Sequence, residues 1–216
     1  MRNRIKKVAV ELLIRHGYRG LRFGDIATRQ GTTRANIHYH FGTKQRLVEE
    51  VIDDYIAETL ARYRPIWMDE QASFQDKIRA CIEFNRQRYR RFNRRGDRGK
   101  PWSLITRMRA ERDVLSPRTN ATLHDFGVEI DRYITSAIEQ AKARGELGPE
   151  APVRDIALQL ACIVNRAASI TRDTGGFEEL EQVYLAFARV IHHAYGRKSR
   201  PDGVRQTARA RVAYIG

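Results

Sequence analysis

A helix–glycine–helix pattern within residues 22–44 constrains the fold of this chain more than any other feature. The first helical pattern covers residues 25–30 and turns a narrow apolar edge inward. Gly31 follows, where the end of a helix favours a residue that tolerates positive φ. Thr32 and Thr33 then offer side-chain oxygens that can cap a second helix over residues 34–41. The sequence therefore predicts two short helices joined by a tight turn.

The second of these helices has almost no apolar surface. Only Ile37 and Phe41 are strongly apolar, one turn apart, so a single edge packs inward and the other faces carry hydrogen-bonding groups. Such a helix fits the recognition helix of a helix-turn-helix unit. Arg34 suits the acceptors of guanine, Asn36 suits the edge of adenine, and His38 can donate or accept at a base edge. The spacing alone fits equally well a polar surface helix that lies between two core helices, so this alternative stays open.

The same region resembles a known family. Residues 5–51 are similar to the N-terminal DNA-binding domain of the TetR family of bacterial transcriptional regulators. The matching positions, in order, are Ile5 to Ala9, Leu12, Leu13, His16, Gly17, Tyr18, Asp25, Ile26, Ala27, Gly31 to Ile37, Tyr39, His40, Phe41, Lys44 and Leu47. Together with the residue types, the resemblance indicates contact with double-stranded operator DNA through Arg22, Thr32, Thr33, Arg34, Ala35, Asn36, His38, Tyr39, His40 and Lys44.

Two features depart from the family pattern. Leu21 and Arg22 stand where Thr or Ser is usual, and an arginine side chain cannot accept a backbone N–H. We therefore expect the side-chain cap of the second helix to be lost or shifted, while Arg22 can still reach a phosphate as a cation. Small side chains are common where Asn36 sits, so base reading by Asn36 is a feature of this chain.

The charge of the chain favours a polyanionic partner. The 216 residues hold 40 Lys and Arg against 26 Asp and Glu, a formal net charge of +14 with a pI near 10.3. Such a charge predicts nucleic acid as the first partner and an anionic membrane surface as the second. Residues 1–50 hold eleven Lys and Arg against four Asp and Glu, so the excess begins at the expected DNA-binding end.

Helical periodicity runs through the rest of the chain, without a credible strand pattern or an internal repeat. We expect helices over residues 3–16, 44–63, 73–92, 102–112, 117–143, 153–171 and 177–195. Pro65 should close the second of these, and Pro101 should open the fourth. The predicted fold is all-α, with a helix-turn-helix DNA-binding domain at residues 1–46, a helical effector-binding and dimerisation domain at residues 47–196, and a basic flexible tail at residues 197–216.

The resemblance also implies a homodimer and a pocket for a small-molecule effector. In TetR-like proteins the last two helices pair with those of a second copy, which assigns to the dimer interface Ile156, Leu160, Ile163, Val164, Ala167, Val183, Tyr184, Phe187 and Ile191. The middle helices commonly bind the effector, and the expected pocket residues are Cys81, Phe84, Asn85, Trp102, Ile105, Met108, Phe126, Ile130 and Asn165. Ordinary core packing remains the alternative for both sets. Arg109 or Arg166 facing inward would favour an acidic effector.

Other site chemistry has little support in the sequence. The six His residues are scattered, and no catalytic triad order, phosphate loop or glycine fingerprint is present, so we expect no enzyme, metal or cofactor. Cys81 and Cys162 lie in helical patterns without C-x-x-C spacing, and we expect both to be buried and reduced. No apolar run is long enough for a signal peptide or a membrane span, so a cytoplasmic protein without membrane contact is expected.

Two basic segments have two interpretations each. Residues 86–100 hold eight basic residues against a single acid, and residues 197–216 hold six against one. Each is either a solvated basic segment or an added phosphate-contacting patch. The sequence as a whole predicts a sequence-specific transcriptional regulator, a repressor released from a palindromic operator by its effector. The alternative is a basic scaffold protein that coats DNA without sequence choice.

Overall fold

The computed structural model describes residues 1–94 and 98–196, and these residues are helical apart from short connections. The β-type pairing among the described residues is one isolated antiparallel bridge between Leu147 and Gly196. The predicted all-α fold is therefore confirmed. The predicted tail at residues 197–216 and residues 95–97 of the basic segment lie outside the described residues.

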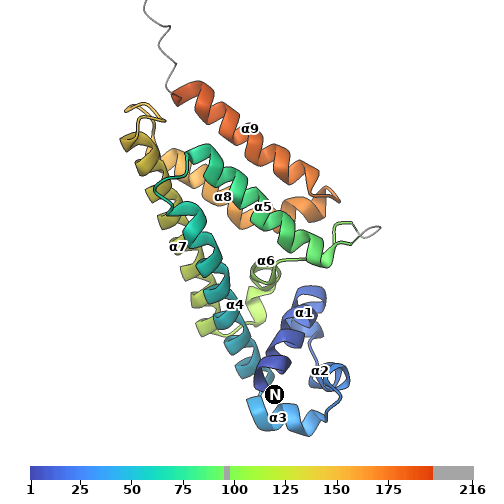
Figure 1. Ribbon diagram of the computed structural model, residues 1–216. Coiled ribbons are helices and arrows are strands. Elements are labelled where there is room, and N and C mark those ends of the chain that lie inside the picture. The colour runs from blue at the N-terminus through green and yellow to red at the C-terminus, as the bar shows by residue number, and fades with distance from the viewer. Residues whose placement is uncertain (95–97, 197–216) are drawn as a thin grey trace, which may run out of the picture.

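The N-terminal helices form a small bundle at one end of the molecule (Figure 1). It contains α1 (Arg2–Gly20), α2 (Phe23–Gln30), α3 (Arg34–Phe41) and the first turns of α4 (Lys44–Trp67). Their apolar edges meet in one core, whose buried side chains include Ile5, Leu12, Leu13, Ile26, Ile37, Phe41 and Leu47. The α3 helix thus docks by the narrow edge that the sequence predicts.

The remaining helices form a larger bundle around α4 and α7 (Figure 1). They are α5 (Phe74–Phe92), α6 (Leu104–Arg109), the 3₁₀ turn η1 (Arg112–Val114), α7 (Pro117–Ala143), α8 (Val153–Asp173) and α9 (Glu178–Tyr195). The α4 helix packs along α7, α7 packs on α8, and α8 packs on α9. The short α6 lies between the two bundles and faces α1.

Serine side chains start three helices of the larger bundle. Ser73, Ser103 and Ser116 each accept the backbone N–H of the residue three positions on, which satisfies a free donor at the helix end. The α7 helix begins at Pro117, as predicted. The α6 helix begins later than predicted, because Trp102 is buried in the bundle ahead of the Ser103 cap.

Pro65 does not close its helix. It lies inside α4, which continues to Trp67, so the predicted end at this proline is wrong. A proline removes one backbone donor, and near a helix end that loss affects a single turn. Trp67 is fully buried, and its packing into the bundle gives the last turn a reason to stay helical.

A buried hydrogen-bonded group crosses the larger bundle. The Tyr63 hydroxyl donates to Asn85 Oδ1 at 3.1 Å, and Asn85 Nδ2 donates to the Tyr184 hydroxyl at 3.4 Å. Cys81 Sγ lies 3.6 Å from the same hydroxyl, and burial raises the pKa of this thiol to about 12. Cys81 is buried, as expected. Cys162 is exposed on α8, so its predicted burial is wrong.

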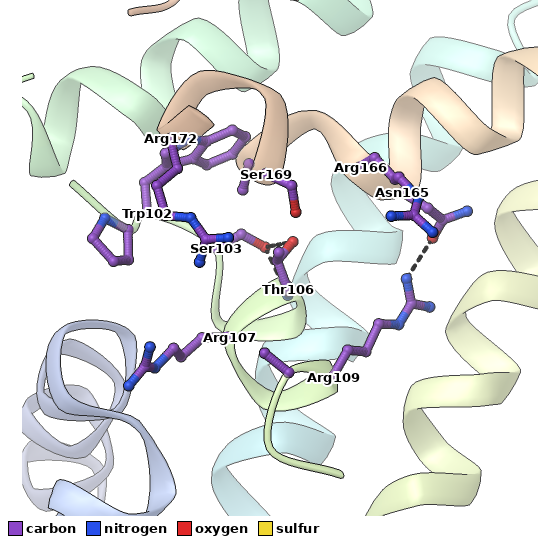
Figure 2. Close-up of a pocket in the computed structure, with 12 residues that line it drawn as sticks. Trp102, Ser103, Thr106, Arg107, Arg109, Asn165, Arg166, Ser169 and Arg172 are labelled. Atoms are coloured by element: carbon purple, nitrogen blue, oxygen red, sulfur yellow. Dashed lines mark hydrogen bonds between the residues drawn. The ribbon is translucent and has the colours of Figure 1, made fainter. Parts of the chain in front are cut away.

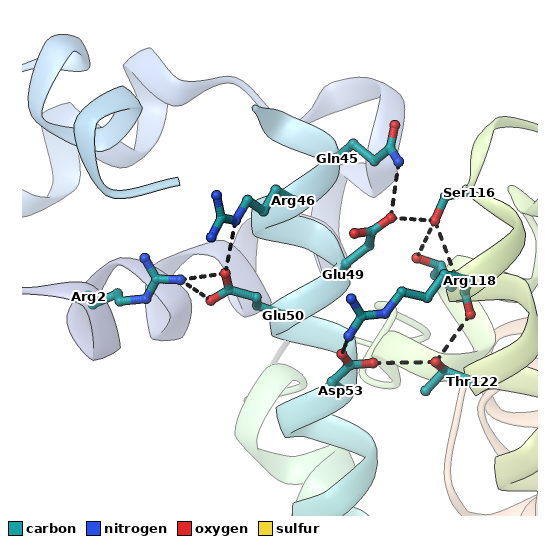
Figure 3. A network of polar contacts seen from close by, with 10 residues as sticks. Arg2, Gln45, Arg46, Glu49, Glu50, Asp53, Ser116, Arg118 and Thr122 are labelled. Atoms are coloured by element: carbon teal, nitrogen blue, oxygen red, sulfur yellow. Dashed lines mark hydrogen bonds and ion pairs between the residues drawn. The ribbon is translucent and has the colours of Figure 1, made fainter. Parts of the chain in front are cut away.

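A polar joint links the first half of α4 to the start of α7 (Figure 3). The Ser116 hydroxyl donates to Glu49 Oε1 at 2.7 Å, and Arg118 pairs with Asp53 at 2.6 Å. The hydrogen bond from Ser116 is the main reason that the pKa of Glu49 lies below its usual value. This joint fixes α4, which carries the small bundle, against the body of the molecule.

Candidate nucleic-acid interface and arginine cleft

The turn between α2 and α3 has the predicted geometry. Gly31 ends α2 with φ 60° and ψ 39°, in the left-handed region that favours glycine. Thr33 caps α3 by accepting the backbone N–H of Asn36 at 3.1 Å. Arg22 precedes α2 without a side-chain cap, which confirms the loss expected from this departure from the family pattern.

The polar faces of α3 differ in how freely they meet solvent. The exposed side chains of this helix are Arg34, Ala35, His38 and Tyr39. Tyr39 is the most open of them, with 85% of its surface exposed. Asn36 is half-buried, and its Nδ2 donates to Thr32 Oγ1 at 2.8 Å. If Asn36 contacts a base, its side-chain amide must serve both that base and Thr32. The His38 ring makes no side-chain hydrogen bond within the described residues.

A groove of about 920 Å³ lies between α3 and the starts of α2 and α4. Its walls carry the cations Arg22, Arg34 and Lys44, with Asp25 as the one acidic side chain. His38 lines the same groove. The structure thus brings together two predicted base-reading residues, Arg34 and His38, and two predicted phosphate contacts, Arg22 and Lys44, on a single concave surface.

Lys44 is held at the rim of this groove. Its Nζ lies 3.4 Å from the backbone oxygen of Arg19 and 4.5 Å from the centre of the Tyr18 ring. Burial is the main cause that lowers the pKa of Lys44 below its usual value. The groups in contact with the amine are neutral, and the nearby Glu111 carboxylate offsets only part of the burial, so a phosphate would add a direct charged partner.

A second joint connects the end of α1 to the segment after α6. Glu111 Oε2 accepts the backbone N–H of Arg19 at 3.1 Å, and Glu111 Oε1 pairs with Arg107 at 3.1 Å. A Cβ at Gly17, where φ is 72°, would lie 1.8 Å from Glu111 Oε1. Asp113 adds an ion pair with Arg19 at 2.6 Å. The entry to α2 is therefore positioned by carboxylates of the larger bundle.

A cleft of about 400 Å³ lies between α6 and α8 (Figure 2). We call it the arginine cleft, and its walls are Pro101, Trp102, Ser103, Thr106, Arg107, Arg109, Ala110, Asn165, Arg166, Ala168, Ser169 and Arg172. No wall residue is acidic. Figure 2 shows the arginines on different sides of the cleft, with Arg107 toward α1 and Arg109 toward α7.

Arg109 is held in this cleft by neutral groups alone. Its guanidinium donates to Asn165 Oδ1 at 2.8 Å and to the backbone oxygen of Leu123 at 2.9 Å. Burial lowers the pKa of Arg109, and no carboxylate offsets that effect. Gly127 on α7 leaves room for the group, because a Cβ there would lie 3.2 Å from Arg109 Nη2. Arg109 is thus a desolvated cation without a counter-charge.

The nine side chains predicted to form a pocket do not gather in one cavity. Those that line the arginine cleft or the small inner cavity behind it are Asn85, Trp102, Ile105, Phe126 and Asn165. Phe84 lines a separate cleft between α1, α4 and α5. The side chains packed in the core outside these walls are Cys81, Met108 and Ile130.

Sequence reasoning missed the polar walls of the cleft. The missed residues are Ser103, Thr106, Arg107, Ser169 and Arg172. Apolar periodicity finds the face of a helix that packs, and it does not show which way a long cationic side chain bends. The signal that was available is Ser103 three residues before Thr106, which marks the start of α6 and places both hydroxyl groups together.

Comparison with known proteins agrees with this arrangement. Residues 5–51, which hold α1 to α3 and the start of α4, match the model described as bacterial regulatory proteins, tetR family. Residues 5–51 therefore carry the N-terminal domain of the TetR family. Members of this family are DNA-binding regulators, not enzymes, which agrees with the absence of catalytic motifs in the sequence.

A curated relative supports the same assignment at the N-terminal end. The HTH-type transcriptional regulator QacR of Staphylococcus aureus (strain Mu50 / ATCC 700699) is 32% identical over 71 residues. That match covers 33% of this chain and 36% of the relative, so it spans about a third of QacR.

Solved structures show the same fold over almost the whole chain. A TetR-family regulator from Agrobacterium tumefaciens superposes with a TM-score of 0.73 at 21% identity, covering 91% of this chain and 97% of that chain. A TetR regulator from Chloroflexus aurantiacus gives a TM-score of 0.73 at 23% identity, covering 90% of this chain and 96% of that chain. The larger bundle therefore has the same fold as the corresponding part of these solved structures.

Most residues that the sequence assigns to a dimer interface are buried within the single chain. The buried ones are Ile156, Leu160, Val164, Ala167, Tyr184, Phe187 and Ile191, and the half-buried ones are Ile163 and Val183. The apolar side chains that stay exposed are Leu158 near the start of α8 and Val190 near the end of α9, at 65% and 64%. Apolar periodicity selected the wider stripe of each helix, which faces the chain's own core.

The described part of the basic segment, residues 86–94 and 98–100, makes many contacts within the fold. Arg86 pairs with Glu181, and Arg88 donates to the Tyr55 hydroxyl at 2.8 Å. Arg91 lies 3.5 Å from a carboxylate oxygen of Glu11. Arg86, Arg88 and Arg91 therefore have partners within the chain, which leaves fewer cations of this segment for a phosphate patch.

Metal sites and membrane-spanning helices are two further features to consider for the described residues. No three or more His, Cys, Asp and Glu side chains gather there into a group that could hold a metal ion. None of the helices described is both long and apolar enough to cross a membrane.

Proposed function

We propose that this chain is a sequence-specific transcriptional regulator that binds a palindromic operator as a homodimer. The observation that carries the proposal is the presentation of α3. Ile37 and Phe41 fix the helix to the core, while Arg34, His38 and Tyr39 face solvent beside a groove lined with cations. Rigidly held side chains of this kind can read base edges in a major groove, and the groove cations can bind phosphates.

The proposal includes repression and its release by a small molecule. A dimer bound across the operator would block a promoter, with its two α3 helices in successive major grooves about 34–36 Å apart. An effector that binds better to a different head spacing would weaken DNA binding, typically by about 1–3 kcal/mol of coupling. We place the boundary between the DNA-binding domain and the effector-binding domain near residue 46. A cytoplasmic location is part of the same proposal.

The proposed dimer uses the outer faces of α8 and α9. Leu158 and Val190 are apolar side chains on these helices that the single chain leaves exposed to solvent, and a partner chain packed there would bury them. Leu158→Glu would place a charge in that contact, and we expect the dimer to dissociate at micromolar concentration in sedimentation experiments. Exposed Val128→Glu on α7 is the matched control. Equal behaviour of the two variants would move the interface elsewhere.

The decisive experiment selects bound sequences from a random duplex pool at about 150 mM salt, where nonspecific binding is weak. A recovered palindrome with fixed half-site spacing supports the regulator. Tight binding without any enriched sequence would support the DNA-coating alternative. The observation that favours this alternative is the net charge of +14. Removing residues 197–216 separates the two in the same assay, because only the coating protein should lose most of its affinity.

A further inference from the structure

We propose that the arginine cleft binds a small organic acid, with its carboxylate at Arg109 and its apolar body against Trp102. The assignment of this acid as the effector rests on the proposed function, whereas its binding does not. The cleft volume of about 400 Å³ falls within the range of small-molecule sites.

The charge of the cleft selects against other ligand classes. Four arginines and no acidic residue form its walls, so a cationic ligand would meet repulsion from several sides. Arg107 and Arg172 pair with Glu111 and Asp173 behind the walls, whereas a neutral ligand would leave Arg109 without a counter-charge. A carboxylate matches the planar fork of a guanidinium with two parallel hydrogen bonds, which makes it the favoured anion here.

Arg109 is the residue that most needs an anion. It is half-buried, it donates to Asn165 Oδ1 and to a backbone oxygen, and no carboxylate lies with it. A desolvated cation held by neutral acceptors costs free energy in the unliganded protein. An incoming carboxylate recovers that cost, so the binding energy is concentrated at this residue.

The other walls suit the rest of an organic acid. The Trp102 indole N–H donates to Thr171 Oγ1 at 2.7 Å, which fixes the orientation of the ring. Ala110 and Ala168 add small apolar surfaces, and Ser169 is a hydroxyl on the α8 side. A flat apolar body with one acidic end fits these groups better than a fully hydrated inorganic anion.

Arg107 connects the cleft to the reading head. Its Nη2 pairs with Glu111 Oε1 at 3.1 Å, and Glu111 also accepts the backbone N–H of Arg19 at the end of α1. A carboxylate bound at Arg109 acts on the short α6 helix, which also carries Arg107. A shift of α6 alters the Arg107–Glu111 pair that positions the entry to α2, so binding of the acid and binding of DNA are coupled.

The test uses 1-naphthoate as the probe and 1-naphthamide as its neutral counterpart of nearly equal shape. Calorimetric titration into the full chain without DNA, at constant ionic strength, should show the acid binding at least about tenfold more tightly than the amide. Arg109→Gln should lose about tenfold or more of the acid affinity. Arg90→Gln removes the same charge from an exposed site on α5 outside the cleft, and it should bind like the parent.

Several outcomes would overturn the assignment. They are equal binding of acid and amide, no binding of either at millimolar concentration, or equal losses in the Arg109 and Arg90 variants. Circular dichroism checks that each variant is folded, and Thr106→Ala provides a second cleft variant with a smaller expected loss. Because DNA is absent, a failure to find an operator leaves this result untouched. A bound acid that leaves an operator complex unchanged at saturation would refute the regulatory role alone.

Discussion

The α3 surface and the arginine cleft are both rich in arginine, yet they hold their cations in different environments. Arg22 and Arg34 stand in solvent beside an open groove. Arg107 and Arg109 are half-buried, and Arg109 keeps neutral partners only. Exposed charges act through a field that salt screens within about 8–10 Å, which suits attraction of a polyanion. Desolvated charges act at contact distance, which suits selection of one small anion. Net charge alone distinguishes neither role.

The largest effect is expected at Gly17, where α1 contacts Glu111 in the segment after α6. Gly17→Ala places a Cβ 1.8 Å from Glu111 Oε1 at a φ of 72°. Left-handed strain and crowding should together lower the free energy of unfolding by about 3 kcal/mol. Chemical denaturation measures this loss. Gly24→Ala is the control, since a Cβ there meets nothing within 4 Å, and its stability should stay equal or rise.

The second expected effect concerns reading rather than stability. His38→Ala should lower discrimination between operator and scrambled DNA by about 2 kcal/mol. Asn36→Ala should cost less, about 1 kcal/mol, because part of its amide already binds Thr32. Mobility-shift titrations on both DNAs give the comparison. If each variant weakened both DNAs equally, neither residue would read bases.

The third effect concerns the rim of the groove. Lys44→Ala should weaken binding to all sequences alike and make the slope of log affinity against log salt shallower by about 0.9. Burial lowers the pKa of Lys44, and a bound phosphate would raise that pKa by favouring the charged amine, so the contact counts in the salt slope. Arg90→Gln serves as the control outside the interface. An unchanged slope for Lys44→Ala would exclude a phosphate contact there.

The smallest effect tests the joint that carries the reading head. The pKa of Glu49 is lower in the folded chain than in the unfolded chain, chiefly through the Ser116 hydrogen bond. Its stabilisation is therefore present above the unfolded pKa and is lost as pH falls through the folded pKa. Loss of the Glu49 hydrogen bond in Ser116→Ala should cost about 0.5 kcal/mol at neutral pH, since the carboxylate is partly solvated, and this part of the cost should shrink below about pH 4. Loss of the α7 cap adds a cost that does not depend on pH. Denaturation at several pH values measures both costs. A cost independent of pH would assign the effect to the lost α7 cap.

The parts of the molecule predictable from sequence are those fixed by local geometry. Gly31, the Thr33 cap and the inward pair Ile37 and Phe41 each depend on neighbours within about one helical turn, and the structure confirms all three. The ends of most helices follow from serine, glycine and proline for the same reason. Pro65 failed because burial of Trp67 outweighs the local signal.

The parts that escaped prediction depend on which surface meets which. The apolar stripes of α8 and α9 were real, but they cover the chain's own core, and the exposed Leu158 lies off the stripe. The direction of Arg109 depends on Gly127 and Asn165, which are distant in sequence from each other. Tertiary neighbours of this kind leave no periodic trace in the sequence.

The unbroken length of α4 has a consequence for how little motion is needed to release DNA. Its 24 residues give an arm about 36 Å long, at about 1.5 Å per residue. Tilting such an arm by about 5° about its far end moves the tip by about 3 Å, close to the rise of one base pair at about 3.4 Å. In a two-fold pair the displacements add, and the two reading helices would fall out of step with the double helix. A rotation too small to disturb the core can therefore act as a complete release.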